Sequence, residues 1–566
     1  MDAADGVQSF YWAEFKTMCS IGWPMLVSFF CRMGMASEDS AFVGHITKTS
    51  HHVPQRRLGA AFGDLGSLAL SASVGYAFVA GTSDDDIGPK AFLAAAGLSD
   101  MVTSLLIIPP LAFNQSLNAL VGQAMGSGNK KMAGTWLLLS VFWLTIGYIP
   151  MLICFFFVGD ILHLLGFDAK LCGLANSYAK FNVFWPIPNG WYQCMRFYFQ
   201  AQGITRPAMY NNIAFLGVNA LLNWIFVFGG PFRHPGLGGW QGFGFIGAAI
   251  SLSCSRSMQP LAYWLYMFVW KRAHLETWPG MSSGFLKAEH QKKFMAMSLP
   301  QIGTLILQAA IGQSTTLLIS QLGEAAIASS AAVAAVTQVF TGGLTAALSS
   351  VGGIRVGYYL GKGDGVSASR AGWLSIGIGS AAVAVIAVFV LPLGKILMGV
   401  VTSSDSVQDL GFKLLPAVLL NTLASIAVNV GTGGILTSQG RVSMVTCLSM
   451  GFELPLSLGS TALLVLVFKS NLVVVYWAQA IVSVLEAGVV CFIVTRSDWG
   501  RYAREARVRQ NAEEDDSEPT GPGTSLVVVT DENNEKSSGG APSSTMASST
   551  DGDARTLSKV EPSSPS

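Results

Sequence analysis

Two adjacent carboxylates, Glu38 and Asp39, lie within the first long apolar segment of the chain, residues 20–44. A carboxylate at membrane depth is costly unless it is paired, protonated or bound to a cation, so such residues are functional candidates. Buried carboxylate oxygens bind either a proton or a hard cation such as Na⁺. Adjacent positions on a helix point about 100° apart. The two side chains therefore cannot both face one cavity squarely, and our hypothesis is that Asp39 binds the ion and that Glu38 is accessory.

A structural ion pair is the alternative interpretation of Asp39. Its partner would be Arg32, seven residues earlier on roughly the same helical face, or Arg256, which lies within a later apolar segment. Pro24, near the start of the first segment, lacks a backbone N–H and breaks a helical hydrogen bond. A switch of Asp39 between charged and neutral states would give this helix two preferred packings, and Pro24 marks where we expect it to bend.

The composition indicates a polytopic membrane protein. Of the 566 residues, 51% are hydrophobic and 12% are charged, against about 25% charged in soluble domains. The formal net charge is +1, and the basic residues do not form a stripe, so nucleic acid is excluded as a partner. No zinc-protease, nucleophile-elbow or Walker motif occurs. We therefore expect no enzyme activity, no cofactor and no metal beyond Na⁺ at Asp39, and an ion gradient as the driving force.

Twelve segments are long and apolar enough to span a bilayer, for which about 20 residues are needed. The alternating pattern of a membrane β-barrel is absent, so the expected fold is all-α. The spans cover approximately 20–44, 98–122, 133–158, 173–201, 208–229, 244–270, 296–321, 325–358, 371–399, 410–437, 441–468 and 471–495.

The basic residues of the short loops gather on one side of this arrangement, which predicts that the N- and C-termini are cytoplasmic. We expect a multi-pass protein of the plasma or vacuolar membrane. The region between the first two spans, about 46–95, is interpreted as an extracytoplasmic insertion. Its segment 65–81 is apolar, but a span there would place Lys16 opposite the other basic clusters.

Five regions follow from this assignment. They are a cytoplasmic N-terminus at 1–19, an N-lobe of six helices at 20–270, a cytoplasmic linker at 271–295, a C-lobe of six helices at 296–495 and a disordered cytoplasmic tail at 496–566. The tail is rich in Ser, Thr, Pro, Gly and acidic residues, a composition that cannot bury a core.

An internal repeat relates the two lobes. Gly128 and Gly203 follow the second and fourth spans and are 75 residues apart, whereas Gly363 and Gly440 follow the eighth and tenth spans and are 77 residues apart. Pro24 and Pro300 begin the first and seventh spans in the same way. Matching marks six helices apart imply two parallel lobes related by a pseudo-two-fold axis along the membrane normal.

Several short motifs occur in order along the chain: FVGH at 42–45, LNALVGQAMGSGN at 117–129, QAQG at 200–203, NALLNWIFVFG at 219–229 and GAA at 247–249. Together they resemble the MATE (multidrug and toxic compound extrusion) family, over about residues 14–497. The resemblance implies a V of two six-helix bundles that exchanges organic cations or amphiphiles for Na⁺ or H⁺. In NorM-like members an acid on the first helix and two asparagines on the fifth surround the ion.

The resemblance places the acid on Asp39 and the asparagines on Asn219 and Asn223, which are one helical turn apart and so share a face. The acids that many members carry on the seventh and tenth helices are missing. The corresponding stretches hold Gln308 to Gln313 and Asn421, which remain accessory candidates. Glu453, midway along the eleventh span, is either a displaced C-lobe carboxylate or a buried hydrogen-bonded acid.

These observations predict a secondary active antiporter that exports organic cations, drugs or amphiphilic metabolites by alternating access. Its partners would be a small organic substrate and the lipid bilayer, and we expect a monomer. One alternative is a lipid-linked oligosaccharide or lipid flippase of the same superfamily, which would need basic residues along its groove. A second alternative is a membrane-embedded sensor or enzyme without transport.

Overall fold

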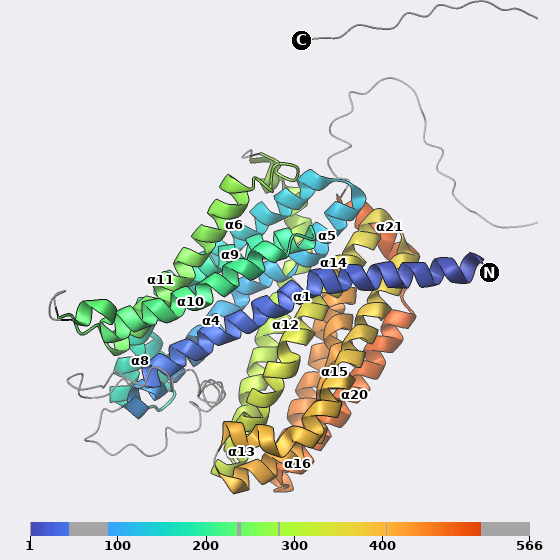
Figure 1. Cartoon of the computed structure of the whole chain (residues 1–566). Helices are drawn as coiled ribbons and strands as arrows, with labels where there is room; N and C mark the ends of the chain where they lie inside the picture. Colours follow the sequence, from blue (N-terminus) through green and yellow to red (C-terminus); the bar gives the residue numbers. More distant parts are fainter. Residues whose placement is uncertain (1, 45–88, 235–238, 281–282, 403, 511–566) are drawn as a thin grey trace, which may run out of the picture. The chain divides into compact units, whose positions relative to one another are not determined.

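The computed structural model describes residues 2–44, 89–234, 239–280, 283–402 and 404–510. Every element within these ranges is a helix (Figure 1). Eight of the described helices are long and apolar enough to cross a membrane, or nine if the pair Ala325–Thr337 and Phe340–Lys362, bent by 47°, is counted as one span. Helices also occupy the other segments that the sequence predicts to span, so the all-α prediction is confirmed for the described residues.

The first half of the chain forms a long first helix followed by shorter ones. Pro24 lies inside α1 and does not end it. The bounds are α1 (Asp2–Gly44), α4 (Pro89–Gln115), α5 (Leu117–Ser127), α6 (Lys130–Phe155), α7 (Val158–Leu164), α8 (Ala169–Phe181), α9 (Pro186–Ala201), α10 (Arg206–Phe228), α11 (Phe245–Trp264) and the π-helix η5 (Leu265–Trp270), with short 3-10 turns η2 (Asn182–Phe184), η3 (Gly230–Arg233) and η6 (Ser283–Leu286).

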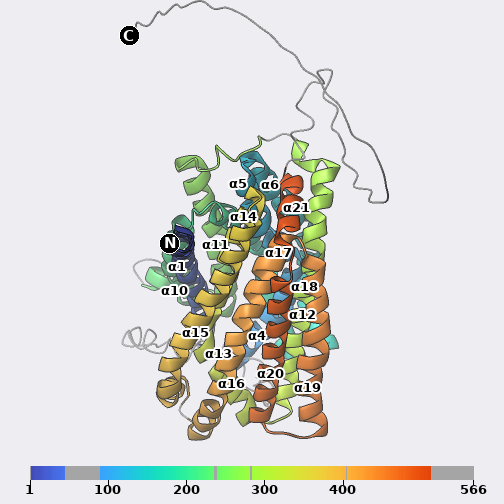
Figure 2. The ribbon, with the colours of Figure 1, turned by 90° about the vertical axis from the view of Figure 1, so that its right-hand side faces the viewer.

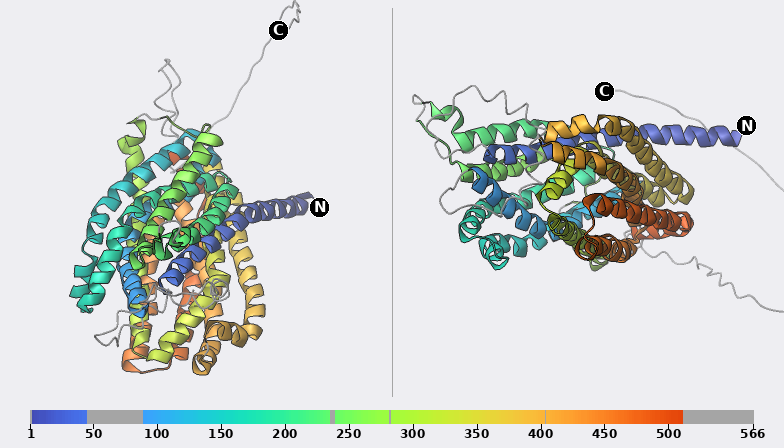
Figure 3. Two further views of the ribbon diagram at one scale, coloured as in Figure 1. Left: turned by 60° about the vertical axis from the view of Figure 1, so that its left-hand side comes forward. Right: turned by 90° about the horizontal axis from the view of Figure 1, so that it is seen from below.

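The second half contains several π-helical stretches between α-helical ones. Its elements are α12 (Ala288–Ser320), α13 (Glu324–Thr337), η7 (Gln338–Gly342), α14 (Gly343–Lys362), α15 (Gly365–Val401), α16 (Asp405–Asn429), η8 (Val430–Leu436), α17 (Thr437–Gln439), α18 (Val442–Leu448), η9 (Ser449–Leu458), α19 (Gly459–Ala462), η10 (Leu463–Val467), α20 (Leu472–Thr495) and α21 (Trp499–Gln510). Seen from below, most helices of the first half lie on one side and most of the second half on the other, and α1 extends across both (Figure 3).

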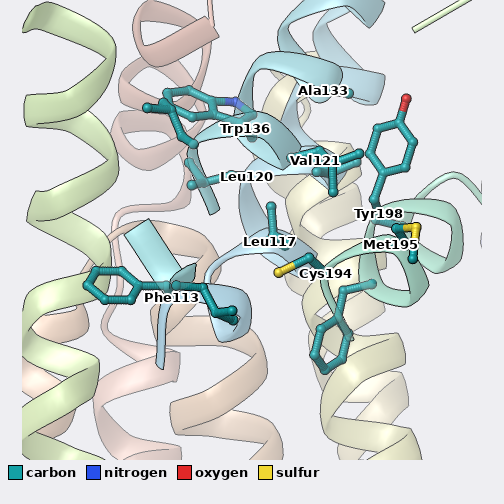
Figure 4. Packing of buried hydrophobic residues seen from close by; sticks show 14 of the residues in the cluster. Phe113, Leu117, Leu120, Val121, Ala133, Trp136, Cys194, Met195 and Tyr198 are labelled. Carbon is teal, nitrogen blue, oxygen red and sulfur yellow. The ribbon is translucent and has the colours of Figure 1, made fainter. Parts of the chain in front are cut away.

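A large apolar cluster holds α5, α6 and α9 together (Figure 4). Trp136 of α6 and Leu117 and Leu120 of α5 are fully buried, and Phe113 and Tyr198 pack around them. A second cluster joins the end of α1 to α4, α8 and α11. These two clusters fix the relative positions of the helices that carry the predicted site residues.

The helices α5 and α14 cross at glycines. A Cβ on Gly126 of α5 would overlap the backbone carbonyl of Tyr358, and one on Gly361 of α14 would overlap the carbonyl of Gln123. One turn earlier in each helix, Gly122 and Gly357 leave only 3.0 Å between an added Cβ and the facing carbonyl oxygen. Small residues four apart let two helices approach to backbone contact. Each of these two helices also ends at a glycine with positive φ, Gly128 or Gly363, so the repeated glycines have the same conformation in both halves.

The helix α21 was not expected, because the sequence predicts disorder from residue 496. It packs against α14, α15 and α5 (Figure 2). Arg509 donates one hydrogen bond to Gln123 Oε1 at 3.2 Å and another to the Gln439 carbonyl at 3.2 Å. Gln510 is fully buried and accepts a hydrogen bond from Trp136 Nε1 at 3.0 Å. Contacts with distant residues therefore stabilise a helix whose own composition is highly polar.

Two other predictions, the insertion before the second span and the bend at Pro24, are tested only in part. The predicted insertion, about 46–95, lies outside them up to residue 88, including the apolar segment 65–81. Its last residues, from Pro89, belong to α4 and are helical instead of forming a loop. The helix α1 runs through Pro24 without a break, and the bend at Pro24 stays a prediction.

Candidate cation site

Asp39 lies on α1 against two asparagines of α10. Its side chain is 8% exposed, and both asparagines are fully buried. Asp39 Oδ1 accepts a hydrogen bond from Asn219 Nδ2 at 2.9 Å and another from Asn223 Nδ2 at 2.8 Å. The spacing of one helical turn puts both amides on the face of α10 that packs against α1. The structure therefore brings together the three residues that the sequence selects.

Glu38 joins the same cluster, although the helical rotation predicts that it points away. Asn219 Nδ2 also donates to Glu38 Oε2 at 3.1 Å and to the Met35 carbonyl at 3.4 Å. The glutamate side chain is one methylene longer than that of aspartate, which lets its carboxylate reach the amide from the neighbouring position. One amide therefore contacts both acids.

Asp100 is a third acid of this region, and the sequence reasoning missed it. It lies on α4 and interacts electrostatically with Asp39 and with Tyr178 of α8. Because Asp100 falls within the predicted span 98–122, the rule that selects Asp39 would also have selected it. Among the described residues, three carboxylates on two helices therefore share one part of the bundle.

The alternative interpretation of Asp39 required a salt bridge to Arg32 or Arg256. No such ion pair occurs within the part of the chain that the structure describes. Arg32 donates instead to Gln193 Oε1 at 3.2 Å. Arg256 of α11 interacts electrostatically with both Asp39 and Glu38 without a direct contact. The direct partners of Asp39 are thus neutral amides.

The side-chain oxygens of Asp39, Asn219 and Asn223 are suitable ligands for a small hard cation. The carbonyl oxygens Asn219 Oδ1 and Asn223 Oδ1 are buried and have no hydrogen-bond partner in the described structure. Together with the Asp39 carboxylate they are hard oxygen ligands, the type that alkali and alkaline-earth cations prefer. A proton on Asp39 would also remove the buried charge. No cluster of three or more His, Cys, Asp or Glu suited to a metal ion occurs among the described residues.

In the second half of the chain, the structure brings together some of the predicted C-lobe site residues. Gln308 Nε2 of α12 donates to Glu453 Oε1 of η9 at 3.1 Å, and Ser449 Oγ lies 3.4 Å from the same oxygen. Glu486 of α20 is 6% exposed and interacts electrostatically with Glu453. Gln313 and Asn421 make no side-chain hydrogen bond to another described residue, so the structure does not join them to this group.

A further buried ion pair connects the two halves and was not selected from the sequence. Arg355 of α14 donates to both carboxylate oxygens of Glu14 on α1, at 2.6 and 2.7 Å. Tyr359 OH donates to Glu14 at 2.8 Å. Arg355 falls within the predicted span 325–358, so a charge in an apolar segment was again the available signal.

Comparisons with known proteins show which family and which fold the chain shares. An uncharacterized transporter from Schizosaccharomyces pombe is 26% identical over 360 residues, which are 62% of this chain and 63% of that protein, slightly less than two thirds of its length. Multidrug and toxin extrusion protein 1 from Xenopus tropicalis is 25% identical over 401 residues, 69% of this chain and 66% of that protein.

The crystal structure of the eukaryotic MATE transporter AtDTX14 superposes with a TM-score of 0.69 at 19% identity, covering 88% of this chain and 100% of that one, and shows the shared fold. The MatE family model matches residues 85–225 and 300–458, more than half of the chain. The two matched segments fall in the two halves that the internal repeat predicts. The chain is therefore a member of the MATE transporter family.

Proposed function

We propose that the chain is a secondary active antiporter in which a cation bound at Asp39, with Asn219 and Asn223, drives export of a small amphiphilic organic molecule. The observation that carries this proposal is the buried Asp39 carboxylate, whose direct partners are two neutral amides. A carboxylate held in this way is charged without a cation and neutral with one. We infer that this cluster serves as the NorM-like cation site that the family resemblance implies.

The coupling follows from the change in charge. When Asp39 is ionised, the amides of Asn219 and Asn223 donate to it and hold α1 against α10. When Na⁺ or H⁺ neutralises the carboxylate, these charge-assisted hydrogen bonds weaken. The packing of α1 on α10 then differs between the two states, and the cation shifts the equilibrium by its differential affinity for them.

We infer that the remaining architecture serves the same exchange. Two lobes of six helices, 20–270 and 296–495, rock against each other, with the linker 271–295 and both termini on the cytoplasmic side of the plasma or vacuolar membrane. Glu453, with Gln308 and near Glu486, is the candidate acid of the second lobe. The protein acts as a monomer and needs no cofactor besides the coupling ion.

Proteoliposomes test the proposal. Uptake of the cationic dye rhodamine B ethyl ester is measured under a Na⁺ gradient and, separately, under a pH gradient, for the wild type and for Asp39→Asn. We expect one gradient to drive uptake by the wild type, and Asp39→Asn to lose this uptake while it still binds the dye. Equal gradient-driven uptake by both proteins would refute the role of Asp39, and no gradient dependence in the wild type would refute antiport.

A further inference from the structure

Three arginines lie in the same bundle as these acids, and only one of them, Arg256, has the acids as electrostatic partners. Arg32 is on α1, Arg196 on α9 and Arg256 on α11, and all three are partly buried. Arg32 lies close enough to the other two for repulsion between the guanidinium groups. Buried charges are normally paired, because an unpaired one loses its hydration without compensation.

The three arginines are compensated unequally. Arg256 has Asp39 and Glu38 as electrostatic partners. The main electrostatic neighbours of Arg32 are Arg196, Arg256 and Tyr192, and those of Arg196 are Tyr192 and Tyr263. Neither of these two lists contains a carboxylate, and neither arginine forms an ion pair in the described parts of the chain.

A single neutral oxygen lies between Arg32 and Arg196. Gln193 Oε1 accepts from Arg32 Nη1 at 3.2 Å and from Arg196 Nε and Nη2 at 2.9 and 2.6 Å. Gln200 Oε1 is a weaker acceptor for Arg196 Nη1, at 3.4 Å. Two guanidinium groups carry ten N–H donors between them, and the acceptors in these four hydrogen bonds are all neutral amide oxygens.

Buried donors without partners surround the same pair. Tyr263 is 1% exposed, its hydroxyl has no hydrogen-bond partner in the described structure, and it interacts electrostatically with Arg196. Gln200 is fully buried, and its Nε2 is also unpartnered although its Oε1 faces Arg196. Arg196 also lies over the Phe197 ring, 4.4 Å from its centroid, a contact that supplies no anionic acceptor. Buried polar groups normally find a partner, so unsatisfied donors beside two guanidinium groups without an ion-pair partner indicate a missing acceptor.

We propose that Arg32 and Arg196, with Gln193 between them, form a binding site for the anionic group, a carboxylate, sulfonate or phosphate, of the organic molecule that this protein carries. Planar guanidinium groups bind such oxyanions through two parallel hydrogen bonds. Arg32 precedes Asp39 by seven residues on α1, about 10 Å along the helix axis. The preferred substrate is therefore an anionic or zwitterionic amphiphile whose negative group lies about two helical turns from the cation site.

The inference rests on the transport function proposed above, so its test uses equilibrium binding without any ion gradient. Rhodamine B and its ethyl ester differ only in a carboxylate that is free in one and esterified in the other. Binding of each dye to the purified, detergent-solubilised protein is measured by fluorescence anisotropy, for the wild type, Arg32→Gln, Arg196→Gln and Arg196→Lys. Arg206→Gln, at the exposed beginning of α10, is the matched control.

We expect the wild type and Arg206→Gln to bind rhodamine B at least about tenfold more tightly than its ester, the ratio for one charge-assisted contact. Arg32→Gln and Arg196→Gln should abolish this preference, and Arg196→Lys should retain part of it because it keeps the charge but not the planar fork. Size-exclusion profiles identify a variant that does not fold. If one of the two glutamine variants does not fold, the other one tests whether the preference is lost.

Equal affinity of the wild type for both dyes, or a preference that persists in the glutamine variants, would overturn the site. Phosphatidylglycerol added to the micelles distinguishes a lipid headgroup from a soluble anion. Displacement of rhodamine B by phosphatidylglycerol but not by phosphatidylcholine would assign the site to a lipid, and no displacement supports a soluble substrate. The wild type could prefer rhodamine B over its ester and yet show no gradient-driven uptake. That result would contradict antiport but would still support the anion site.

Discussion

Arg355 of α14 donates two hydrogen bonds to the carboxylate of Glu14 on α1, so an ion pair connects the first helix of the chain to a helix of its second half. Glu14 is 3% exposed. Removing one partner of a buried pair leaves the other charge uncompensated, which costs about 3–5 kcal/mol. We expect Arg355→Met and Glu14→Gln each to lower the thermal unfolding temperature strongly, and the double variant to be less destabilised than the sum of the two.

The exposed pair between Lys395 and Asp409 is the control for this cycle. Their side chains are 64% and 62% exposed, and exposed pairs contribute about 0–1 kcal/mol. Lys395→Met should therefore leave the unfolding temperature nearly unchanged. Additive effects of the two variants at 14 and 355 would contradict a coupled pair.

Asn219 should matter more than Asn223 for the coupling ion. Asn219 donates to both Glu38 and Asp39, whereas the donor of Asn223 bonds to Asp39. A hydrogen bond to a charged group contributes about 1.5–3 kcal/mol. Asn219→Leu should therefore weaken the apparent affinity for the coupling cation more than Asn223→Leu, with Asn211→Leu on the same helix as the control. The concentration of Na⁺ or H⁺ that gives half-maximal exchange is the measurement, and the reverse order would contradict the arrangement.

Asp100 contributes negative potential to the site of Asp39. Two charges interact by about 1–2 kcal/mol at separations near 10 Å and an effective dielectric constant of 20. We expect Asp100→Asn to keep cation-driven uptake but to weaken the apparent cation affinity by about tenfold. The same titration of exchange in proteoliposomes measures this. Complete loss of coupling would instead make Asp100 an equal partner of Asp39.

The sequence predicts most of the fold and part of the site. Long apolar segments and acids within them are local signals, and they suffice for the helices and for Asp39. The spacing of Asn219 and Asn223 fixes their common face on α10, and the resemblance supplies their partner. The position of Glu38 depends on how far its side chain extends, which helical rotation alone does not describe.

Features that depend on contacts between distant residues cannot be predicted from local sequence patterns. The helix α21 has a polar composition, and residues more than 300 positions earlier, such as Trp136 and Gln123, hold its end. The pairing of Arg355 with Glu14 likewise spans 341 positions. No local pattern encodes which buried charges meet, so these relationships require the packed structure.

The glycine crossing of α5 and α14 should not tolerate even a methyl group. Added Cβ atoms on Gly126 or Gly361 would overlap facing backbone carbonyls, so the helices would have to move apart. Overpacking of this kind costs about 1–3 kcal/mol. We expect Gly126→Ala and Gly361→Ala to lower the unfolding temperature. Gly217→Ala on α10, where a Cβ meets nothing within 4 Å, should be neutral or stabilising because alanine favours a helix.

The contacts of α21 predict its effect on stability. Arg509→Ala removes hydrogen bonds to Gln123 of the first half and to Gln439 of the second. Each is worth about 1.5–3 kcal/mol when the donor is charged, so we expect a lower unfolding temperature. Arg504→Ala, exposed on the same helix, should have little effect. An equal decrease for both variants would indicate a general loss of helix content instead of these contacts.

The glycines between α5 and α14 also determine how these helices can move against each other. Their backbones touch with no side chain between them, so the interlocked carbonyls oppose sliding but leave the crossing angle free to change. A small change of the crossing angle hardly moves the glycines at the contact. It moves the far ends of both helices much more. This contact could therefore serve as a pivot point between the two helices.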